Sequence, residues 1–159
     1  MEIRDATSDD MKRILALNNA EAEAVNAVQE DWLASMGQQA FALLVAGEPI
    51  EAFVLALSHE TPAQGPNHAW FLARKDRFVY VDRVVVAPSA QRRGVAGKLY
   101  DALEARALAA GIETLCCEVN LIPRNSISLA FHERAGFTPV GEATDPRNGK
   151  RVRYLVRKI

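Results

Sequence analysis

Residues 91–97 have the types and spacing that best suit chemistry with a charged ligand. They read Gln91, Arg92, Arg93, Gly94, Val95, Ala96 and Gly97. Small residues here leave the backbone open to close approach, and Pro88 ends the apolar strand before them. The first amides of a helix lack internal acceptors and carry the positive end of the helix dipole, so an anion is the expected guest. Alone, the run also suits an ordinary strand-to-helix turn, because it is neither a Walker loop nor G-x-G-x-x-G.

A second block of spaced polar and aromatic residues follows further along the chain. The two blocks read Val84-Val-Val-Ala-Pro-x-x-Gln91-x-x-Gly94-x-Ala96 and Asn125-x-x-Ser128-x-x-Phe131-His132-x-x-x-Gly136-Phe137. The first resembles the acyl-CoA signature, Gln/Arg-x-x-Gly-x-Gly/Ala, of the GNAT superfamily of N-acetyltransferases. The second resembles that family's strand–Asn–helix segment, which ends in Gly-Phe. Two ordered blocks at family spacing are more specific than either alone. The resemblance covers residues 81–140 in detail and the rest in outline.

The resemblance implies that acetyl-CoA is bound largely through the backbone. The amides of residues 92–97 would hold the pyrophosphate, and the end of the preceding strand would pair with the pantetheine arm. A slot between that strand and the next would take the thioester, whose carbonyl the Val84 backbone would polarise. The positions so implied to bind or contact acetyl-CoA are Val84, Val85, Val86, Gln91, Arg92, Arg93, Gly94, Val95, Ala96, Gly97, Asn120, Asn125 and Phe131. No metal is expected.

Transfer to an amine requires a proton acceptor, because an alkyl amine has a pKa of about 10.4 and is mostly protonated near pH 7. Asp82, on the strand that leads into the loop, is the favoured base, with Glu118 and Tyr80 as further candidates. An ion pair with Arg83 is the alternative role for Asp82. Strict alternation would place Tyr80 and Asp82 on the same strand face as Val84, unless a bulge intervenes.

The departing thiolate also benefits from a proton donor, because a thiol has a pKa of about 8.5. Many members of the family carry a tyrosine after the phenylalanine of the second block, and this chain has His132 there. A histidine is partly protonated near neutral pH and could serve as that donor. Packing or capping near the end of its helix is the alternative role, and some acyl transfers need no dedicated acid.

Alternating strands and helices must position these residues, as in a mixed α/β fold. Strands are predicted at residues 1–6, 41–46, 50–57, 78–86, 113–120, 137–141 and 151–156. Helices are predicted after residues 7–10, over about 22–36 with Gly37 as the end, over 95–110 and after Asn125. The unit from residue 78 to 120 predicts one parallel crossover in a mostly antiparallel central sheet. Residues 58–77 are expected to form an irregular functional loop.

Composition limits the class of protein and its surroundings. The chain has 159 residues, 49% of them hydrophobic, and a net charge of −1, which fits one domain and argues against a dominant nucleic-acid surface. The only cysteines, Cys116 and Cys117, are adjacent on a predicted strand and are expected to be reduced. No apolar run approaches the ~20 residues of a membrane span. We therefore expect a cytoplasmic protein with one domain over residues 1–159.

The leading interpretation is an enzyme that moves an acetyl group from acetyl-CoA to an amine of a small molecule or peptide. Direct attack is expected, since neither cysteine is placed like a nucleophile. A non-catalytic acyl-CoA sensor is the alternative, and a nucleotide-binding domain with the same loop is a third. Asn67, Trp70 and Phe71 hint at a partly aromatic acceptor pocket, and the C-terminal arginines would suit an acidic acceptor. Neither nucleic acid nor a membrane is an expected partner, and an exposed final strand would permit a homodimer.

Overall fold

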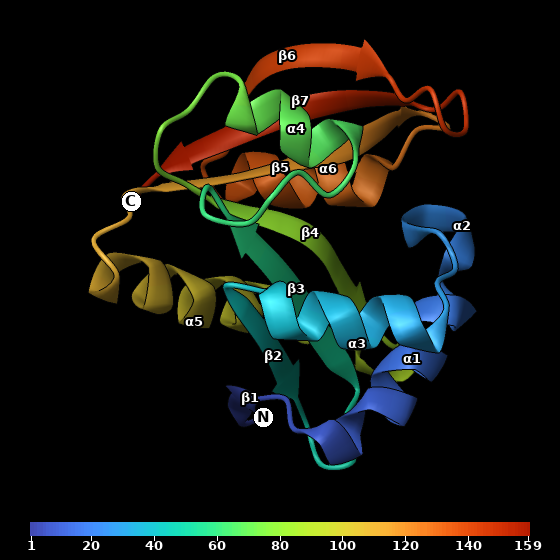
Figure 1. The fold of residues 1–159 in the computed structure, drawn as a ribbon. Coiled ribbons are helices and arrows are strands. Elements are labelled where there is room, and N and C mark those ends of the chain that lie inside the picture. The colour runs from blue at the N-terminus through green and yellow to red at the C-terminus, as the bar shows by residue number, and fades with distance from the viewer.

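Seven strands form one mixed sheet in the order β1-β2-β3-β4-β5-β7-β6 (Figure 1). They are β1 (Ile3–Asp5), β2 (Ala42–Ala46), β3 (Ala52–Ser58), β4 (Val79–Val86), β5 (Thr114–Ile122), β6 (Thr138–Thr144) and β7 (Arg151–Lys158). The computed structural model describes residues 1–159, except for the side chains of Glu23 and Ala24. Among the described strands, β4 and β5 pair in parallel and all other neighbours are antiparallel. The predicted mixed sheet with one parallel crossover is confirmed.

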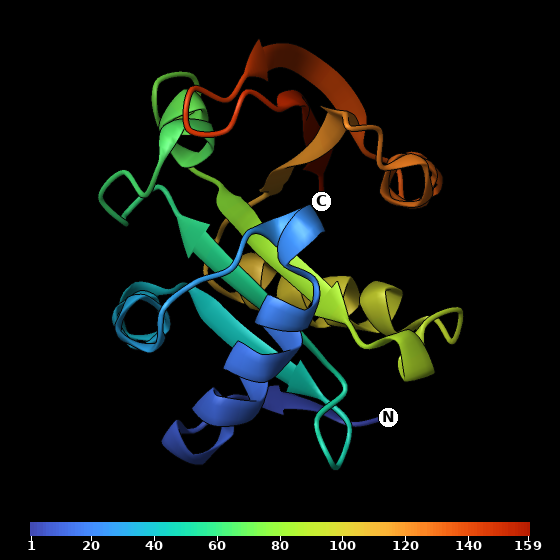
Figure 2. The same cartoon turned by 90° about the vertical axis from the view of Figure 1, so that its right-hand side faces the viewer.

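Helices cover both faces of the sheet (Figure 2). They are the short 3-10 helices η1 (Ser8–Asp10) and η2 (Pro88–Ala90), and α1 (Met11–Ala20), α2 (Ala22–Val25), α3 (Glu30–Gln39), α4 (Pro66–Leu72), α5 (Val95–Ala109) and α6 (Ser126–Arg134). Side chains of α5 and α6 pack on one face, and those of α1, α3 and α4 pack on the other. Among the described helices, none has the length and apolar character to span a bilayer.

The helix α5 is anchored by an apolar stripe that repeats every four residues. Val95, Leu99, Leu103 and Ala107 are all buried in the cluster that includes β2, β3 and β4 residues. Fully burying a side chain such as leucine stabilises the fold by about 1.5–3 kcal/mol, so the stripe holds α5 firmly on the sheet. The loop that precedes α5 is thereby fixed between two well-packed elements, β4 and α5.

The predicted helix over residues 22–36 is wrong in its extent. The chain forms two helices, α2 and α3, and α3 runs past Gly37 to Gln39. Asn26 between them has a φ of 68°, which a continuous helix does not allow. The Asn19 side chain accepts a hydrogen bond from the Val28 N–H at 3.0 Å and donates to the Val28 carbonyl at 3.2 Å. The separation is therefore stabilised by local side-chain bonds that replace helical ones.

The predicted irregular loop over residues 58–77 contains a helix, α4. Pro66 is the first residue of this helix, a position where a backbone N–H would have no helical acceptor, so proline loses no bond there. Gly65 before it has a φ of 96°. Asn67, His68 and Phe71 of α4 are buried. The segment is thus a packed part of the fold and lies against the same face as α1 and α3 (Figure 2).

Candidate active site

β4 and β5 lie side by side for only a short distance and then diverge (Figure 1). Their parallel register consists of Val79 opposite Leu115 and Tyr80 opposite Cys116. Beyond these pairs, β4 remains bonded to β3 and β5 remains bonded to β7. The facing edges of residues 81–86 and 117–122 therefore form no ladder with each other. Unpaired backbone donors and acceptors need other partners, so this opening suits an extended, peptide-like ligand.

A bulge in β4 decides which side chains face which layer. Arg83 pairs with Leu55 and Val81 pairs with Ala56, so Asp82 between them has no residue opposite it on β3. The extra residue reverses the alternation. Tyr80 packs in the cluster on the α1–α3 face, whereas Val84 packs against the cluster on the α5 face. The expectation that Tyr80, Asp82 and Val84 share one face is therefore wrong.

The loop before α5 presents a set of backbone N–H groups without acceptors. Arg92 and Gly94 have φ values of 64° and 73°, and Gly94 is the N-cap of α5 without a side-chain capping bond. Lys98 is the first residue of α5 whose N–H is bonded, at 3.1 Å to the Gly94 carbonyl. Within the described structure, the amides of residues 92–97 have no acceptor. Successive free amides at a helix start form an anion-binding concavity.

Neighbouring residues leave this concavity open and fix the start of the loop that forms it. A Cβ atom added at Gly94 or Gly97 would meet no heavy atom within 4 Å. The left-handed conformation costs a non-glycine residue such as Arg92 on the order of 1–3 kcal/mol, a strain that clusters at ligand sites. The Gln91 side chain donates to the Val86 carbonyl at 3.2 Å and so braces the loop against the end of β4.

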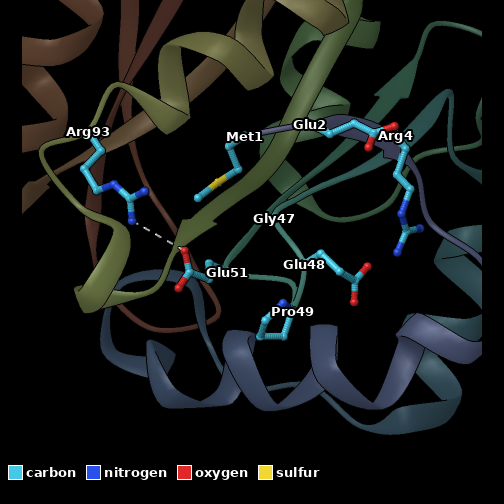
Figure 3. Close-up of a pocket in the computed structure, with 8 residues that line it drawn as sticks. All are labelled: Met1, Glu2, Arg4, Gly47, Glu48, Pro49, Glu51 and Arg93. Atoms are coloured by element: carbon cyan, nitrogen blue, oxygen red, sulfur yellow. Dashed lines mark ion pairs between the residues drawn. The ribbon is translucent and has the colours of Figure 1, made fainter.

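Arg93 is directed away from the opening between β4 and β5. Its guanidinium lies 3.7 Å from the Glu51 carboxylate (Figure 3). Both residues line a hollow of about 380 Å³ next to the β2–β3 hairpin. Residues of β5 do not line this hollow, so it is separate from the opening. The two side chains are partly exposed, and their ion pair is therefore a weak restraint on the loop.

Asp82 is paired with its neighbour. Its Oδ2 accepts a hydrogen bond from Arg83 Nε at 2.7 Å, and both side chains are 10% exposed. The Arg83 guanidinium also donates to Asn18 Oδ1 at 3.0 Å and lies over the Trp32 ring at 4.7 Å. This arrangement corresponds to the ion-pair alternative for Asp82. It fastens the bulge of β4 to α1 and α3.

His132 is enclosed by the protein. It is 3% exposed, and its Nδ1 lies 2.7 Å from the Ser128 carbonyl, to which it donates. Its Nε2 lies 2.7 Å from the Tyr100 hydroxyl, which must then be the donor. Burial lowers the pKa of His132, so the neutral ring is favoured. Rings of Phe131 and Phe137 pack edge-on against it at 5.1 Å.

The other residues of the second block support α6. Asn125 Oδ1 accepts from the Ser128 N–H at 3.1 Å and caps the helix, and its own N–H donates to the Asn120 carbonyl at 3.1 Å. Phe131 is half-buried between Tyr100 and His132. Asn120 lies on β5 past the point where it leaves β4. These residues therefore flank the opening on the β5 side.

Glu118 lies on β5 two residues beyond its last contact with β4 in the parallel register. The Tyr80 hydroxyl donates to both carboxylate oxygens, at 2.6 and 2.8 Å, and Asn67 Nδ2 donates to Oε1 at 3.2 Å. Burial raises the pKa of Glu118 to about 8, with the charge of Asp82 as a further cause, while the bonds from Tyr80 and Asn67 oppose the shift. A carboxyl group with such a pKa exchanges protons near neutral pH.

Two members of this network, Asn67 and Tyr154, were not predicted as parts of a proton-transfer site. The Tyr154 hydroxyl donates to Asn67 Oδ1 at 2.8 Å. The available signal was that a buried tyrosine requires a hydrogen-bond partner, and Tyr154 shares the core-facing side of its strand with Val152 and Val156. Its partner lies 87 residues away in the chain, beyond the reach of local spacing. Within the described residues, no group of three or more His, Cys, Asp or Glu could hold a metal.

Comparison with known proteins identifies relatives of the whole fold. Residues 5–137 match the family model described as "Acetyltransferase (GNAT) family". The ribosomal-protein-alanine N-acetyltransferase from Brucella melitensis superposes with a TM-score of 0.74 at 21% identity, over 100% of both chains. Ard1 from Thermoplasma volcanium superposes with a TM-score of 0.79 at 12% identity, over 99% of this chain and 97% of that one.

A third similar structure carries a ligand. The protein yncA from Salmonella typhimurium, solved with its cofactor acetyl-CoA, superposes with a TM-score of 0.74 at 18% identity. The match covers 99% of this chain and 93% of that one. No curated protein sequence matches the chain. At these identities the solved structures show a shared fold, and the family model shows the family.

Proposed function

The chain belongs to the acetyltransferase (GNAT) family, and from this premise we propose that residues 1–159 act as one N-acetyltransferase domain. The donor is acetyl-CoA, and the acceptor is an amine of a small molecule or peptide. The amine nitrogen attacks the thioester carbonyl carbon, so that a C–N bond forms and the C–S bond breaks. The proton of the amine passes to a base, and the products are an amide and free CoA.

The free amides of residues 92–97 are the observation that best supports the choice of donor. A pyrophosphate offers several anionic oxygens to such a concavity, and the N-terminal dipole of α5 favours negative charge there. The open space outside Gly94 and Gly97 admits the phosphates to the backbone. In this proposal Arg92 adds positive charge at the rim, and Arg93 contributes through its backbone N–H.

The divergence of β4 and β5 supports the placement of the thioester arm. The arm would bond to the free edge of β4 at Val84 and at the Val86 N–H, because the Val86 carbonyl already accepts from Gln91. A backbone N–H near Val84 would then stabilise the oxyanion that develops on the thioester carbonyl. Asn120, Asn125 and Phe131 would flank the arm from the β5 side.

We assign the role of base to Glu118 in place of Asp82. A base that works near neutral pH needs a pKa close to the working pH, and Glu118 has one of about 8. Asp82 is instead bonded to Arg83 at 2.7 Å, with both side chains largely buried. The ionised Glu118 carboxylate would accept the amine proton directly or through one water molecule.

Proton donation to the leaving thiolate is not assigned to His132. Both of its ring nitrogens are bonded inside the protein, and burial lowers its pKa. A thiol with a pKa of about 8.5 can leave as the thiolate near neutral pH and take a proton from solvent. The proposed chemistry therefore depends on one base and a polarised carbonyl.

Release of CoA thiol in the presence of a panel of amines tests this function. Acetyl-CoA turnover with at least one primary amine or peptide N-terminus is the expected result, together with an N-acetyl product in the mass spectrum. CoA binding without turnover on any amine would favour the acyl-CoA sensor instead. Equal thermal stabilisation by CoA, ATP and NAD would favour a general nucleotide-binding domain.

A further inference from the structure

The helix α4 supplies the Glu118 site with a group from outside the two diverging strands. Asn67, on the first turn of α4, is 5% exposed and is bonded at both ends of its amide. Its Nδ2 donates to Glu118 Oε1 at 3.2 Å, and its Oδ1 accepts from the Tyr154 hydroxyl at 2.8 Å. One side chain thus links β5 to β7 through the carboxylate.

The direction of these bonds decides the chemistry of the carboxylate. A carboxylate accepts hydrogen bonds and a protonated carboxyl donates one, so an amide N–H pointing at Glu118 favours the ionised form. The side-chain amide of Asn67 can flip by 180°. Its oxygen would then face Glu118 and favour the protonated carboxyl group. The Tyr154 hydroxyl is satisfied best when Asn67 Oδ1 faces it, which leaves the NH₂ for Glu118. Tyr154 therefore selects the useful orientation of Asn67.

Aromatic stacking on α4 holds both tyrosines of this site. The Trp70 ring stacks on Tyr154 with centroids 4.1 Å apart and planes inclined by 16°. The His68 ring stacks on Tyr80 at 5.3 Å and 20°. The close approach of Trp70 requires Gly141, because a Cβ atom there would lie 2.6 Å from Trp70 Cζ2. This packing thus fixes the positions of the two tyrosine hydroxyls that donate hydrogen bonds in the network.

Other titratable groups surround Glu118 from several elements. They are Tyr80 and Asp82 of β4, Cys116 and Cys117 of β5, Tyr154 of β7, Tyr100 of α5 and Arg147 of the β6–β7 connection. Burial raises the pKa of each of these tyrosines and thiols, so they stay neutral near pH 7. Asp82 and Arg147 are the charged members of the set. Neither is bonded to Glu118, whereas Asn67 is.

We propose that Asn67 is a positioning residue for Glu118, with Tyr154 fixing the orientation of its amide. This inference rests on the proposed role of Glu118 as the base. Asn67 orients the carboxylate and favours its ionised form without contacting acetyl-CoA or the amine. The helix α4 lies in the connection between β3 and β4. Through Asn67, the sequence of this connection therefore influences the pH range in which the proposed acetyl transfer occurs.

The first measurement is the carboxyl pKa of Glu118 by ¹³C NMR in the ligand-free protein, assigned with Glu118→Gln. Loss of the Asn67 bond removes an interaction that lowers the pKa of Glu118, so Asn67→Ala is expected to raise it. Tyr154→Phe keeps the ring on Trp70, removes only the hydroxyl and is expected to raise the pKa in the same direction. The double variant should shift the pKa by less than the sum of the single shifts, because both act through one amide.

The second measurement is the pH dependence of kcat/KM for acetyl transfer. An upward shift of about one pH unit in the acidic limb would lower kcat/KM about tenfold at pH 7, because the ionised fraction falls tenfold per unit below the pKa. The dissociation constant of CoA should not change. Gln64→Ala is the matched control, since among the described residues the Gln64 side chain bonds only to Pro62 and Gln39, near the start of the same helix.

The outcomes separate this inference from the proposed function. If Asn67→Ala and Tyr154→Phe leave the NMR pKa of Glu118 and the pH profile unchanged while remaining folded, Asn67 does not position Glu118. If the NMR pKa rises but the unaltered protein acetylates no amine, the positioning is correct and the acetyltransferase proposal fails. A fall in kcat/KM that is the same at every pH would show a merely structural role for Asn67 and overturn the inference.

Discussion

The Tyr80 hydroxyl donates to both oxygens of the Glu118 carboxylate, at 2.6 and 2.8 Å, where β4 and β5 cease to run side by side. The bulge at Asp82 comes two residues after Tyr80 and turns Val84 to the other face of the sheet. The residues of β4 therefore have two different roles at the opening. Tyr80 serves the acidic group on the α1–α3 face, and the backbone beyond the bulge remains available along the edge.

Glu118→Gln tests the proposed base. The amide has nearly the same shape as the carboxyl but cannot take a proton, so kcat/KM is expected to fall by about 10²-fold or more. The acidic limb near pH 8 should disappear from the pH profile, while the dissociation constant of CoA stays the same. Steady-state kinetics over pH 6–9 and calorimetric titration with CoA make the comparison. Retention of the limb in Glu118→Gln would assign it to another group.

The raised pKa of Glu118 also predicts how stability varies with pH. In the unfolded chain the group has its ordinary value of 4.5, and in the folded protein its pKa is about 8. Between these values the folded state holds more protons, so this contribution to the free energy of unfolding is full below about pH 4.5 and is lost as pH rises through 8. Urea unfolding at several pH values should show this decline in the unaltered protein. The slope should be weaker in Glu118→Gln.

Tyr80→Phe removes the hydroxyl that opposes this shift. The pKa of Glu118 is then expected to rise further, because the bond from Tyr80 is the leading cause that lowers it. The acidic limb of kcat/KM should move to higher pH by more than it does in Asn67→Ala, where the lesser lowering cause is lost. A limb that stays in place would disconnect the observed pH dependence from Glu118.

Gly97→Val tests the anion-binding loop. The new Cβ would meet no heavy atom within 4 Å in the protein, so the free energy of unfolding should change by less than about 1 kcal/mol. The side chain would fill the space through which phosphates reach the free amides, so CoA should bind at least about tenfold more weakly. Ala105→Val, on the exposed side of α5, adds a similar side chain away from the loop and is the control. Equal CoA affinity in both variants would contradict the assigned pyrophosphate site.

His132→Phe separates packing from proton donation. The substitution leaves the buried Tyr100 hydroxyl without its partner, which costs about 1–3 kcal/mol of stability. The pH profile of kcat/KM should keep its shape, because His132 is neutral and bonded on both nitrogens. Thermal unfolding and the pH profile are measured on the same preparation. A large fall in kcat together with a changed shape of the pH profile would restore the role of a proton donor to His132.

Local patterns in the sequence predicted the elements that local interactions determine. Apolar periodicity located the strands, and Gly94 with the residues around it located the start of α5, because strand edges and helix starts depend on adjacent residues. The break at Asn26 was missed because it depends on Asn19 and Val28 forming bonds across a loop. Strict alternation misplaced Tyr80 relative to Val84 because a bulge is a property of two paired strands.

The proton-transfer network around Glu118 was harder to predict from the sequence than the loop before α5. Glu118 was a candidate, but its raised pKa comes from burial and from Asp82, which composition does not reveal. Asn67 lies 51 residues from Glu118 in the chain, and only the packing of α4 brings them together. A short helix that opens with Gly65-Pro66 reads as a turn, since proline and glycine are common in both.

We propose that one chain binds acetyl-CoA at residues 92–97 and uses Glu118 to take the proton of an amine. The most direct test incubates the protein and its Glu118→Gln variant with acetyl-CoA and a panel of amines, and follows N-acetyl products by mass spectrometry alongside CoA binding. We predict an acetylated amine with the unaltered protein, a yield lower by about 10²-fold with the variant, and the same CoA affinity for both. Equal yields from the two proteins, or CoA binding without any acetylated amine, would contradict the claim.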